Sequence, residues 1–134
     1  MKWIFVIVLS YLTSCAAPPQ QDNAQVNSAL TASTYKEDHH AKKKNTVLVD
    51  VRTPAEFEGG HLQGAQNADF LSHEFQEAMQ QWDKSKTYYL YCASGNRSGK
   101  AAKLMEEAGF KRVFNIGGFK DLKEAGLPLA NPKP

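Results

Sequence analysis

The residues best suited to chemistry lie together in the segment Cys-Ala-Ser-Gly-Asn-Arg-Ser, residues 92–98. An aromatic-rich, uncharged run before Cys92 predicts a buried strand that ends at this cysteine. Good helix formers from Lys100 to Ala108 predict a helix that Gly109 ends and that Ser98 could cap. Backbone N–H groups at a helix start have no intrahelical partner and stabilise a thiolate. Arg97 adds a positive charge, so the segment indicates a sulfur nucleophile beside a bound anion.

A lone cysteine is more commonly a small buried hydrophobe than a nucleophile. Such a cysteine is expected inside a strand or on the apolar face of a helix. Cys92 instead begins a loop that contains Gly95, which permits a tight turn, and Arg97. Its position therefore favours the reactive interpretation.

The N-terminal residues have the pattern of an export signal. Lys2 precedes a mostly apolar run from Trp3 to Leu12, which is too short to span a bilayer comfortably. The sequence Leu-Thr-Ser-Cys at residues 12–15 resembles the lipobox of bacterial lipoproteins, although an ordinary secretory signal could contain a cysteine by chance. On the lipoprotein interpretation, residues 1–14 are a signal peptide and Cys15 carries the lipid. Cys92 is then the one free thiol of a periplasmic protein, in a compartment that favours oxidation.

The next segment, residues 15–45, is expected to be the lipidated cysteine and a flexible tether. It is rich in Pro, Gln, Asn and Ser and has no sustained apolar period, although part of Leu30 to Asp38 could form an edge strand or a short helix. The pair His39-His40 has no further ligand nearby at metal-binding spacing, so no metal is expected. The run Lys42–Lys44 is expected to be solvated, or to contact anionic lipid headgroups. Ala16, in place of Asp after the lipidated cysteine, favours the outer over the inner membrane.

Residues 46–134 are expected to form one domain, which suits a chain of 134 residues. The formal net charge of +2 gives no sign of a nucleic-acid partner. Apolar runs alternate with helical patterns, which predicts an α/β fold with a mostly parallel central sheet flanked by helices on both faces. Ligands of such sheets bind beyond the carboxyl ends of the strands, where Cys92 lies. The expected strands lie at 46–51, within 61–68, at 88–91 and at 112–116. The expected helices are a short one capped by Thr53 and begun by Pro54, an amphipathic one between 70 and 82, and two more at 100–108 and 119–124. The apolar residues expected on the buried face of the amphipathic helix are Phe70, Leu71, Phe75, Ala78, Met79 and Trp82.

Three motifs follow one another in the chain: Leu48–Phe57 with Gly60–Asn67, then Tyr91–Ser98, then Asn115–Phe119 with Gly126–Leu129. In this order they resemble the signatures of rhodanese domains. The resemblance covers Thr46 to Leu129, and the small size and export signal are similar to the single-domain phage shock protein E type. Leu122 departs from the family, whose last helix usually carries a second aromatic residue, and the polar segment before Thr46 lacks the apolar helix of many members.

The resemblance implies a sulfurtransferase, that is, a thiosulfate sulfurtransferase (rhodanese), without a cofactor. Cys92 would take a sulfane sulfur from a small anionic donor such as thiosulfate and pass it, as a persulfide, to cyanide or to a thiol, including a protein thiol. Arg97 would hold the loop and attract the donor. Asp50, Arg52, Glu56 and His61 match signature positions with structural roles, and Arg52 and Glu56 are expected to pair. The N–H groups that would surround the sulfur and bind substrate belong to Ala93, Ser94, Gly95, Asn96, Arg97 and Ser98.

Two other functions fit the same motifs. One is a phosphatase or arsenate reductase. Rhodanese-fold phosphatases place five residues between the cysteine and the arginine, whereas four separate Cys92 from Arg97 here. The shorter loop suits sulfur better than a tetrahedral oxyanion. Other rhodanese-like domains are non-catalytic binding or persulfide-carrier modules, but many of those lack the cysteine.

Overall fold

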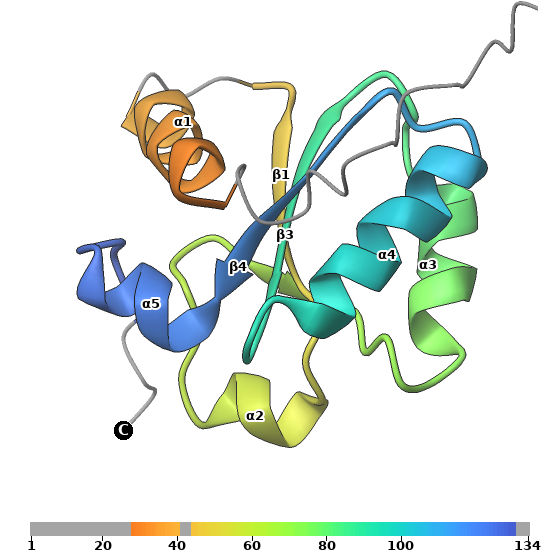
Figure 1. Cartoon of the computed structure of the whole chain (residues 1–134). Coiled ribbons are helices and arrows are strands. Elements are labelled where there is room, and N and C mark those ends of the chain that lie inside the picture. Colours follow the sequence, from red (N-terminus) through yellow and green to blue (C-terminus); the bar gives the residue numbers. More distant parts are fainter. Residues whose placement is uncertain (1–27, 41–43, 131–134) are drawn as a thin grey trace, which may run out of the picture.

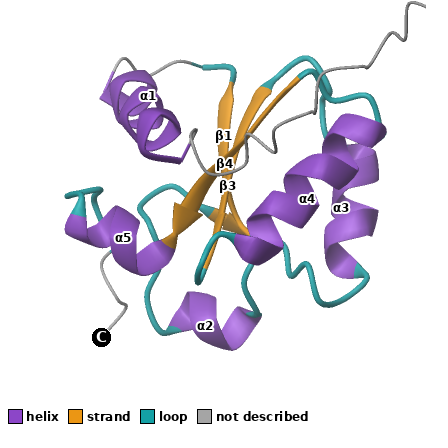
Figure 2. Ribbon diagram, in the orientation of Figure 1, coloured by secondary structure: helices purple, strands orange, loops and turns teal. Residues whose placement is uncertain are grey.

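The chain forms an α/β fold built on a four-stranded parallel sheet of β1 (Thr46–Asp50), β2 (Gln66–Asn67), β3 (Thr87–Cys92) and β4 (Arg112–Gly118), in the strand order β2-β1-β3-β4. This computed structural model describes residues 28–40 and 44–130. Two helices cover each face of the sheet, and α2 lies beyond the carboxyl end of β1 (Figures 1 and 2). The helices are α1 (Ser28–His40) and α5 (Phe119–Glu124) on one face, α3 (Glu74–Gln81) and α4 (Asn96–Glu107) on the other, and α2 (Pro54–Glu58).

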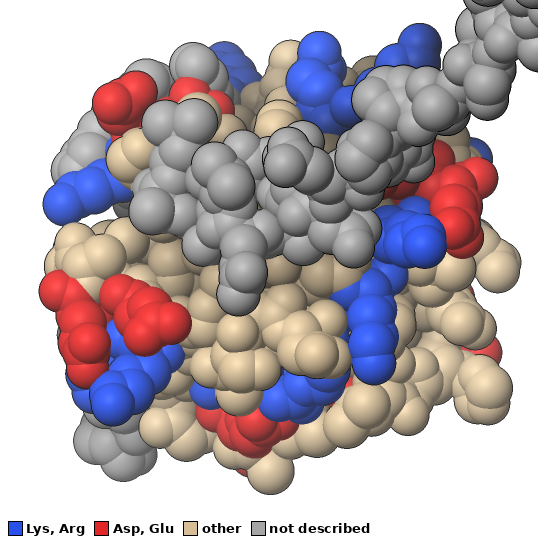
Figure 3. Space-filling view, in the orientation of Figure 1, with Lys and Arg blue, Asp and Glu red and all other residues tan. Residues whose placement is uncertain are grey.

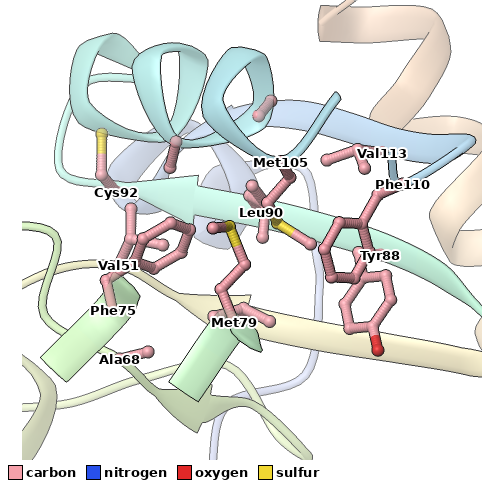
Figure 4. Close-up of a cluster of buried hydrophobic side chains, with 13 residues drawn as sticks. Val51, Ala68, Phe75, Met79, Tyr88, Leu90, Cys92, Met105, Phe110 and Val113 are labelled. Atoms are coloured by element: carbon pink, nitrogen blue, oxygen red, sulfur yellow. The ribbon is translucent and has the colours of Figure 1, made fainter. Parts of the chain in front are cut away.

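Strand β3 is central and supplies both hydrophobic cores. Successive side chains of a strand point to opposite faces of the sheet. Tyr88, Leu90 and Cys92 therefore enter the core beneath α3 and α4 (Figure 4), while Tyr89 and Tyr91 enter the core beneath α1 and α5. All five side chains are at most 2% exposed. Cys92 is thus the last residue of a strand that is held by packing on both of its faces.

Helix α1 corrects the expected tether. Residues 28–40 form a helix that packs on the sheet, so this part of the expected tether at 15–45 belongs to the folded unit. The short helix considered for part of Leu30 to Asp38 is therefore present. Tyr35 is 4% exposed and meets Tyr89 edge-on, with ring centroids 5.1 Å apart. Residues 1–27, with Cys15, lie outside the described residues, as do Lys42, Lys43 and the side chains of the His39-His40 pair. None of the described helices is both long and apolar enough to cross a membrane.

The helix expected between residues 70 and 82 is shorter than its apolar pattern suggests. Helix α3 begins at Glu74, after a turn in which the Asp69 carboxylate accepts the N–H of Leu71 at 2.9 Å. Leu71, which was expected on the buried face, is 68% exposed. Phe75 and Met79 are buried as expected. Phe70 and Trp82 lie just outside the helix and still pack against the core.

Candidate active site

Cys92 is the last residue of β3 and its side chain is buried at the carboxyl edge of the sheet. Its sulfur points toward the first turn of α4 (Figure 4). The chain reaches α4 through Gly95, which has a φ of 90° and is the N-cap residue of the helix. A residue with a Cβ would be strained in this left-handed conformation, so a glycine belongs here. Ala93, Ser94 and Asn96 are exposed and form the outer surface of the loop.

Two donors converge on the sulfur. The Gly95 N–H donates to Sγ at 3.0 Å, and the Ser98 hydroxyl lies 3.4 Å from Sγ. Burial raises the pKa of the Cys92 thiol, but the Ser98 hydroxyl and the N–H groups of Ser98, Ser94 and Gly95 outweigh it, so the pKa lies below its usual range. A thiol with a lowered pKa is the better nucleophile near neutral pH.

Ser98 does not cap the helix, contrary to the expectation from sequence. Helix α4 begins at Asn96, two residues earlier, and no side chain caps it. Ser98 is fully buried in the first turn, where its hydroxyl donates to Asn115 Oδ1 at 2.7 Å as well as facing the sulfur. The residue therefore belongs to the lining of the site.

Arg97 forms a bidentate ion pair with Glu56. Its two terminal nitrogens each donate to a carboxylate oxygen at 2.8 Å. These hydrogen bonds lower the pKa of Glu56 to about 2, against the opposing effect of its partial burial. Thr53 is the N-cap of α2 and is followed by Pro54, as expected, and Glu56 completes a capping box with Thr53. The pair ties α4 to α2 and places a carboxylate against the positive charge of Arg97.

The expected pair between Arg52 and Glu56 is wrong. Arg52 instead pairs with the buried carboxylate of Asp50, at 2.7 Å from Nη2, and the same nitrogen donates to the Gly60 carbonyl. Its guanidinium carbon lies 4.2 Å from the centre of the Phe119 ring. These contacts join the ends of β1 and β4 and support the structural role expected of Asp50 and Arg52.

His61 also has structural contacts. Its Nδ1 lies 2.9 Å from the Phe57 carbonyl, and its ring stacks on the Phe57 ring at 3.6 Å. The next residue, Leu62, donates its N–H to the hydroxyl of the buried Tyr91 at 3.0 Å. These contacts fix the chain after α2, and they place His61 against α2.

Asn115 and Gly118 belong to the site but were not predicted as site residues, although both lie in the third motif. Asn115 bonds the Gly95 carbonyl and the Ser98 hydroxyl. Gly118 pairs in register with Cys92, and a Cβ built on it would lie 2.7 Å from the Ala93 carbonyl oxygen. A paired Gly-Gly at a strand end is the signal that could have indicated a close approach of backbone to backbone.

The model of the Rhodanese-like domain family matches residues 31–125. The chain belongs to this family. Helix α1 lies almost wholly within the match, in agreement with its place in the fold.

Related proteins carry different names. The chain is 36% identical over 74 residues to the thiosulfate sulfurtransferase PspE of Escherichia coli, covering 55% of this chain and 71% of that protein. It is 38% identical over 85 residues to the uncharacterized protein YqhL of Bacillus subtilis, covering 63% of this chain and 66% of that protein. It is also 38% identical to a tRNA uridine(34) hydroxylase of Yersinia enterocolitica, but the match covers 63% of this chain and only 27% of that protein.

Solved structures agree with the fold. A structure of a rhodanese with anions from E. coli has a TM-score of 0.55 and 32% identity, covering 64% of this chain and 98% of that one. The Alr3790 protein from Anabaena has a TM-score of 0.66 and 26% identity, covering 75% and 89%. The family and the fold together support sulfurtransferase-type chemistry in general terms.

Proposed function

We propose that this protein is a sulfurtransferase that moves a sulfane sulfur from thiosulfate, or a similar small donor, to a thiophilic acceptor through a persulfide on Cys92. The observation that carries the proposal is the pair of donors on the Cys92 sulfur, the Gly95 N–H at 3.0 Å and the Ser98 hydroxyl at 3.4 Å. They stabilise a thiolate without a histidine base, and the described contacts of the His61 ring are with Phe57. The name of the E. coli relative supports thiosulfate as the donor.

The reaction has two displacement steps. The Cys92 thiolate attacks the outer sulfur of thiosulfate, the S–S bond breaks, and sulfite leaves with the electron pair. The product is a Cys92 persulfide anion. A cyanide or thiolate acceptor then attacks the outer sulfur of the persulfide, giving thiocyanate or a new persulfide, and Cys92 leaves again as the thiolate. No external oxidant or reductant is consumed.

The backbone of the loop is the main partner for the negative charge of the sulfur donor. Arg97 was expected to attract the donor, but Glu56 already occupies both of its terminal nitrogens. Acidic and basic side chains are also intermixed over α5 and α2 on the face seen in Figure 3. We therefore assign anion binding chiefly to the N–H groups of the loop 93–98, where a helix N-terminus favours negative charge. Arg97 is assigned the role of holding α4 against α2.

Intact-mass spectrometry tests the proposal. Wild-type protein treated with thiosulfate should gain the mass of one sulfur atom, and added cyanide should remove it with formation of thiocyanate. Cys92→Ser should gain none. Hydrolysis of p-nitrophenyl phosphate without sulfur transfer would instead establish a phosphatase. A Cys92→Ser variant that keeps its role in cells while losing sulfur transfer would establish a binding module.

We also propose that the domain is held at a bacterial membrane, facing the periplasm, by lipid on Cys15. The support is the lipobox-like sequence at residues 12–15 and the resemblance to an exported type. The full chain should fractionate with membranes, the outer membrane in particular, and Cys15→Ser should release it. Equal amounts of both proteins in the soluble fraction would refute the anchor.

A further inference from the structure

Asn115 uses both ends of its side-chain amide to hold the groups that touch the reactive sulfur. Its Nδ2 donates to the Gly95 carbonyl at 2.9 Å, and its Oδ1 accepts the Ser98 hydroxyl at 2.7 Å. The N–H of Gly117 also donates to Oδ1, at 3.1 Å, which fixes the amide on its own strand. Both residues that Asn115 holds also donate to the sulfur, Gly95 through its N–H at 3.0 Å and Ser98 through its hydroxyl at 3.4 Å.

The strand that carries Asn115 is shaped to present it. The register of β3 with β4 shifts between Leu90 and Tyr91, so that Leu90 pairs with Asn115 but Tyr91 pairs with Gly117. A bulge of this kind redirects the side chains beside it. Asn115 reaches the start of α4 from the neighbouring strand, 17 and 20 residues from its partners Ser98 and Gly95 in the sequence.

The single proton of the Ser98 hydroxyl has two acceptors. With Cys92 as a thiol, the S–H can donate to Ser98 Oγ while the hydroxyl donates to Asn115. With Cys92 as a thiolate, the hydroxyl is 3.4 Å from a full negative charge and can turn toward it. In both states the Ser98 oxygen must stay where Asn115 holds it for the contact with sulfur to exist.

We propose that Asn115 is a positioning residue for the reaction of Cys92, acting through Ser98 and Gly95 without touching the sulfur. This inference deepens the proposed sulfur transfer and rests on it for its biological meaning. The geometry itself concerns only the thiolate, so its test does not depend on any sulfur donor.

The test is the pH dependence of Cys92 alkylation by iodoacetamide in the full chain. A hydrogen bond to a charged group contributes more than a neutral one. Asn115→Ala, which loosens two of them, should raise the apparent thiol pKa by about 0.5 to 1 unit, a roughly three- to tenfold loss of thiolate at pH values below it. Asn67→Ala is the matched control, because the Asn67 amide also makes two hydrogen bonds, to the Asp50 and Arg52 carbonyls, away from this loop. It should leave the thiol titration unchanged.

A double-mutant cycle gives the second readout. If Asn115 acts partly through Ser98, the titration shift of Ser98→Ala with Asn115→Ala should be smaller than the sum of the single shifts. An unchanged thiol pKa in Asn115→Ala would overturn the proposal, because Asn115 would then have no effect on the thiol. A lowered pKa would overturn it too, because Asn115 would then merely compete with the sulfur for the hydroxyl proton. Additive shifts would overturn it as well. Failure of sulfur transfer in wild-type protein with these titration results intact would refute the proposed function alone.

Discussion

Gly118 is the position where one added methyl group should disable the site without touching the sulfur. Its backbone is ordinary extended chain, with φ −95° and ψ 144°, so alanine is not strained there. The added Cβ would nevertheless lie 2.7 Å from the Ala93 carbonyl oxygen and 3.2 Å from Ser94 Cα. Both neighbours are backbone atoms of the active-site loop, and no flexible side chain can move aside to relieve the contact.

The size of the effect follows from these distances. Ordinary contact begins near 3.4 Å, so the loop must move by about 0.7 Å relative to β4. Overpacking of this kind costs about 1–3 kcal/mol of stability. A shift of that size at Ala93 and Ser94 would lengthen the 3.0 Å bond from the Gly95 N–H to Sγ. A hydrogen bond to a charged group is worth about 1.5–3 kcal/mol, so losing it would raise the thiol pKa by about 1–2 units.

We therefore expect Gly118→Ala to lower kcat/KM for thiosulfate at least about tenfold and to raise the pKa of Cys92 measured by alkylation. Gly59→Ala is the matched control, since Gly59 also has a negative φ and its added Cβ would meet nothing closer than 3.5 Å. It should behave as wild type in both assays. If folded Gly118→Ala has wild-type kinetics and a wild-type thiol titration, the contact of β4 with the loop does not determine where the hydrogen-bond donors to the sulfur lie, and the reasoning is refuted.

Three further substitutions test the framework around the site. Because its pKa is held near 2, ionised Glu56 stabilises the fold above the ordinary glutamate pKa, and that contribution is lost as pH falls through about 2. In urea titrations at pH 7, Glu56→Gln should therefore be less stable than wild type by about 1 kcal/mol, a figure reduced because the pair with Arg97 is partly exposed. On acidification the variant should lose less stability than wild type, and parallel pH profiles would contradict this. Tyr91→Phe should cost about 1–3 kcal/mol, because the buried N–H of Leu62 loses its acceptor, and an unchanged urea midpoint would show that the bond contributes nothing. Tyr35→Ala should cost about 3 kcal/mol by emptying the core beneath α1 while leaving the thiol titration intact, and a wild-type melting temperature would mean that α1 adds nothing to the fold.

Elements with a strong local pattern could be predicted from the sequence. Strand β3 was recognised from its run of bulky side chains, and its end at Cys92 was placed correctly. The end of α4 was correct because Gly109 has a φ of 96°, a conformation that favours glycine after a helix. The start of α2 was also predicted correctly from Thr53 and Pro54, although the contribution of Glu56 to the capping box was not.

Features that depend on distant partners could not be predicted in this way. Among residues 32–38, the part of α1 whose side chains the structure describes, Tyr35 is the buried ring. The sequence of the helix is otherwise mostly small or polar, so no apolar period marks it. Arg52 has carboxylates two residues before and four residues after it, and only the fold shows that the first is its partner. Ser98 was predicted as a possible cap from its residue type and position. Its actual hydrogen bond is to Asn115, 17 residues further along the chain, and local sequence does not reveal that partner.

The packing of α1 against the last strand has a consequence for the order of folding. Synthesis delivers the N-terminal segment first, but α1 packs against β4, which begins at Arg112. Strand β4 itself pairs only with β3 within the described sheet, so the sheet must be nearly complete before the helix has a surface to dock on. Contacts between segments so far apart in sequence form slowly. In hydrogen exchange during refolding, the amides of α1 should therefore gain protection after those of β1 and β3.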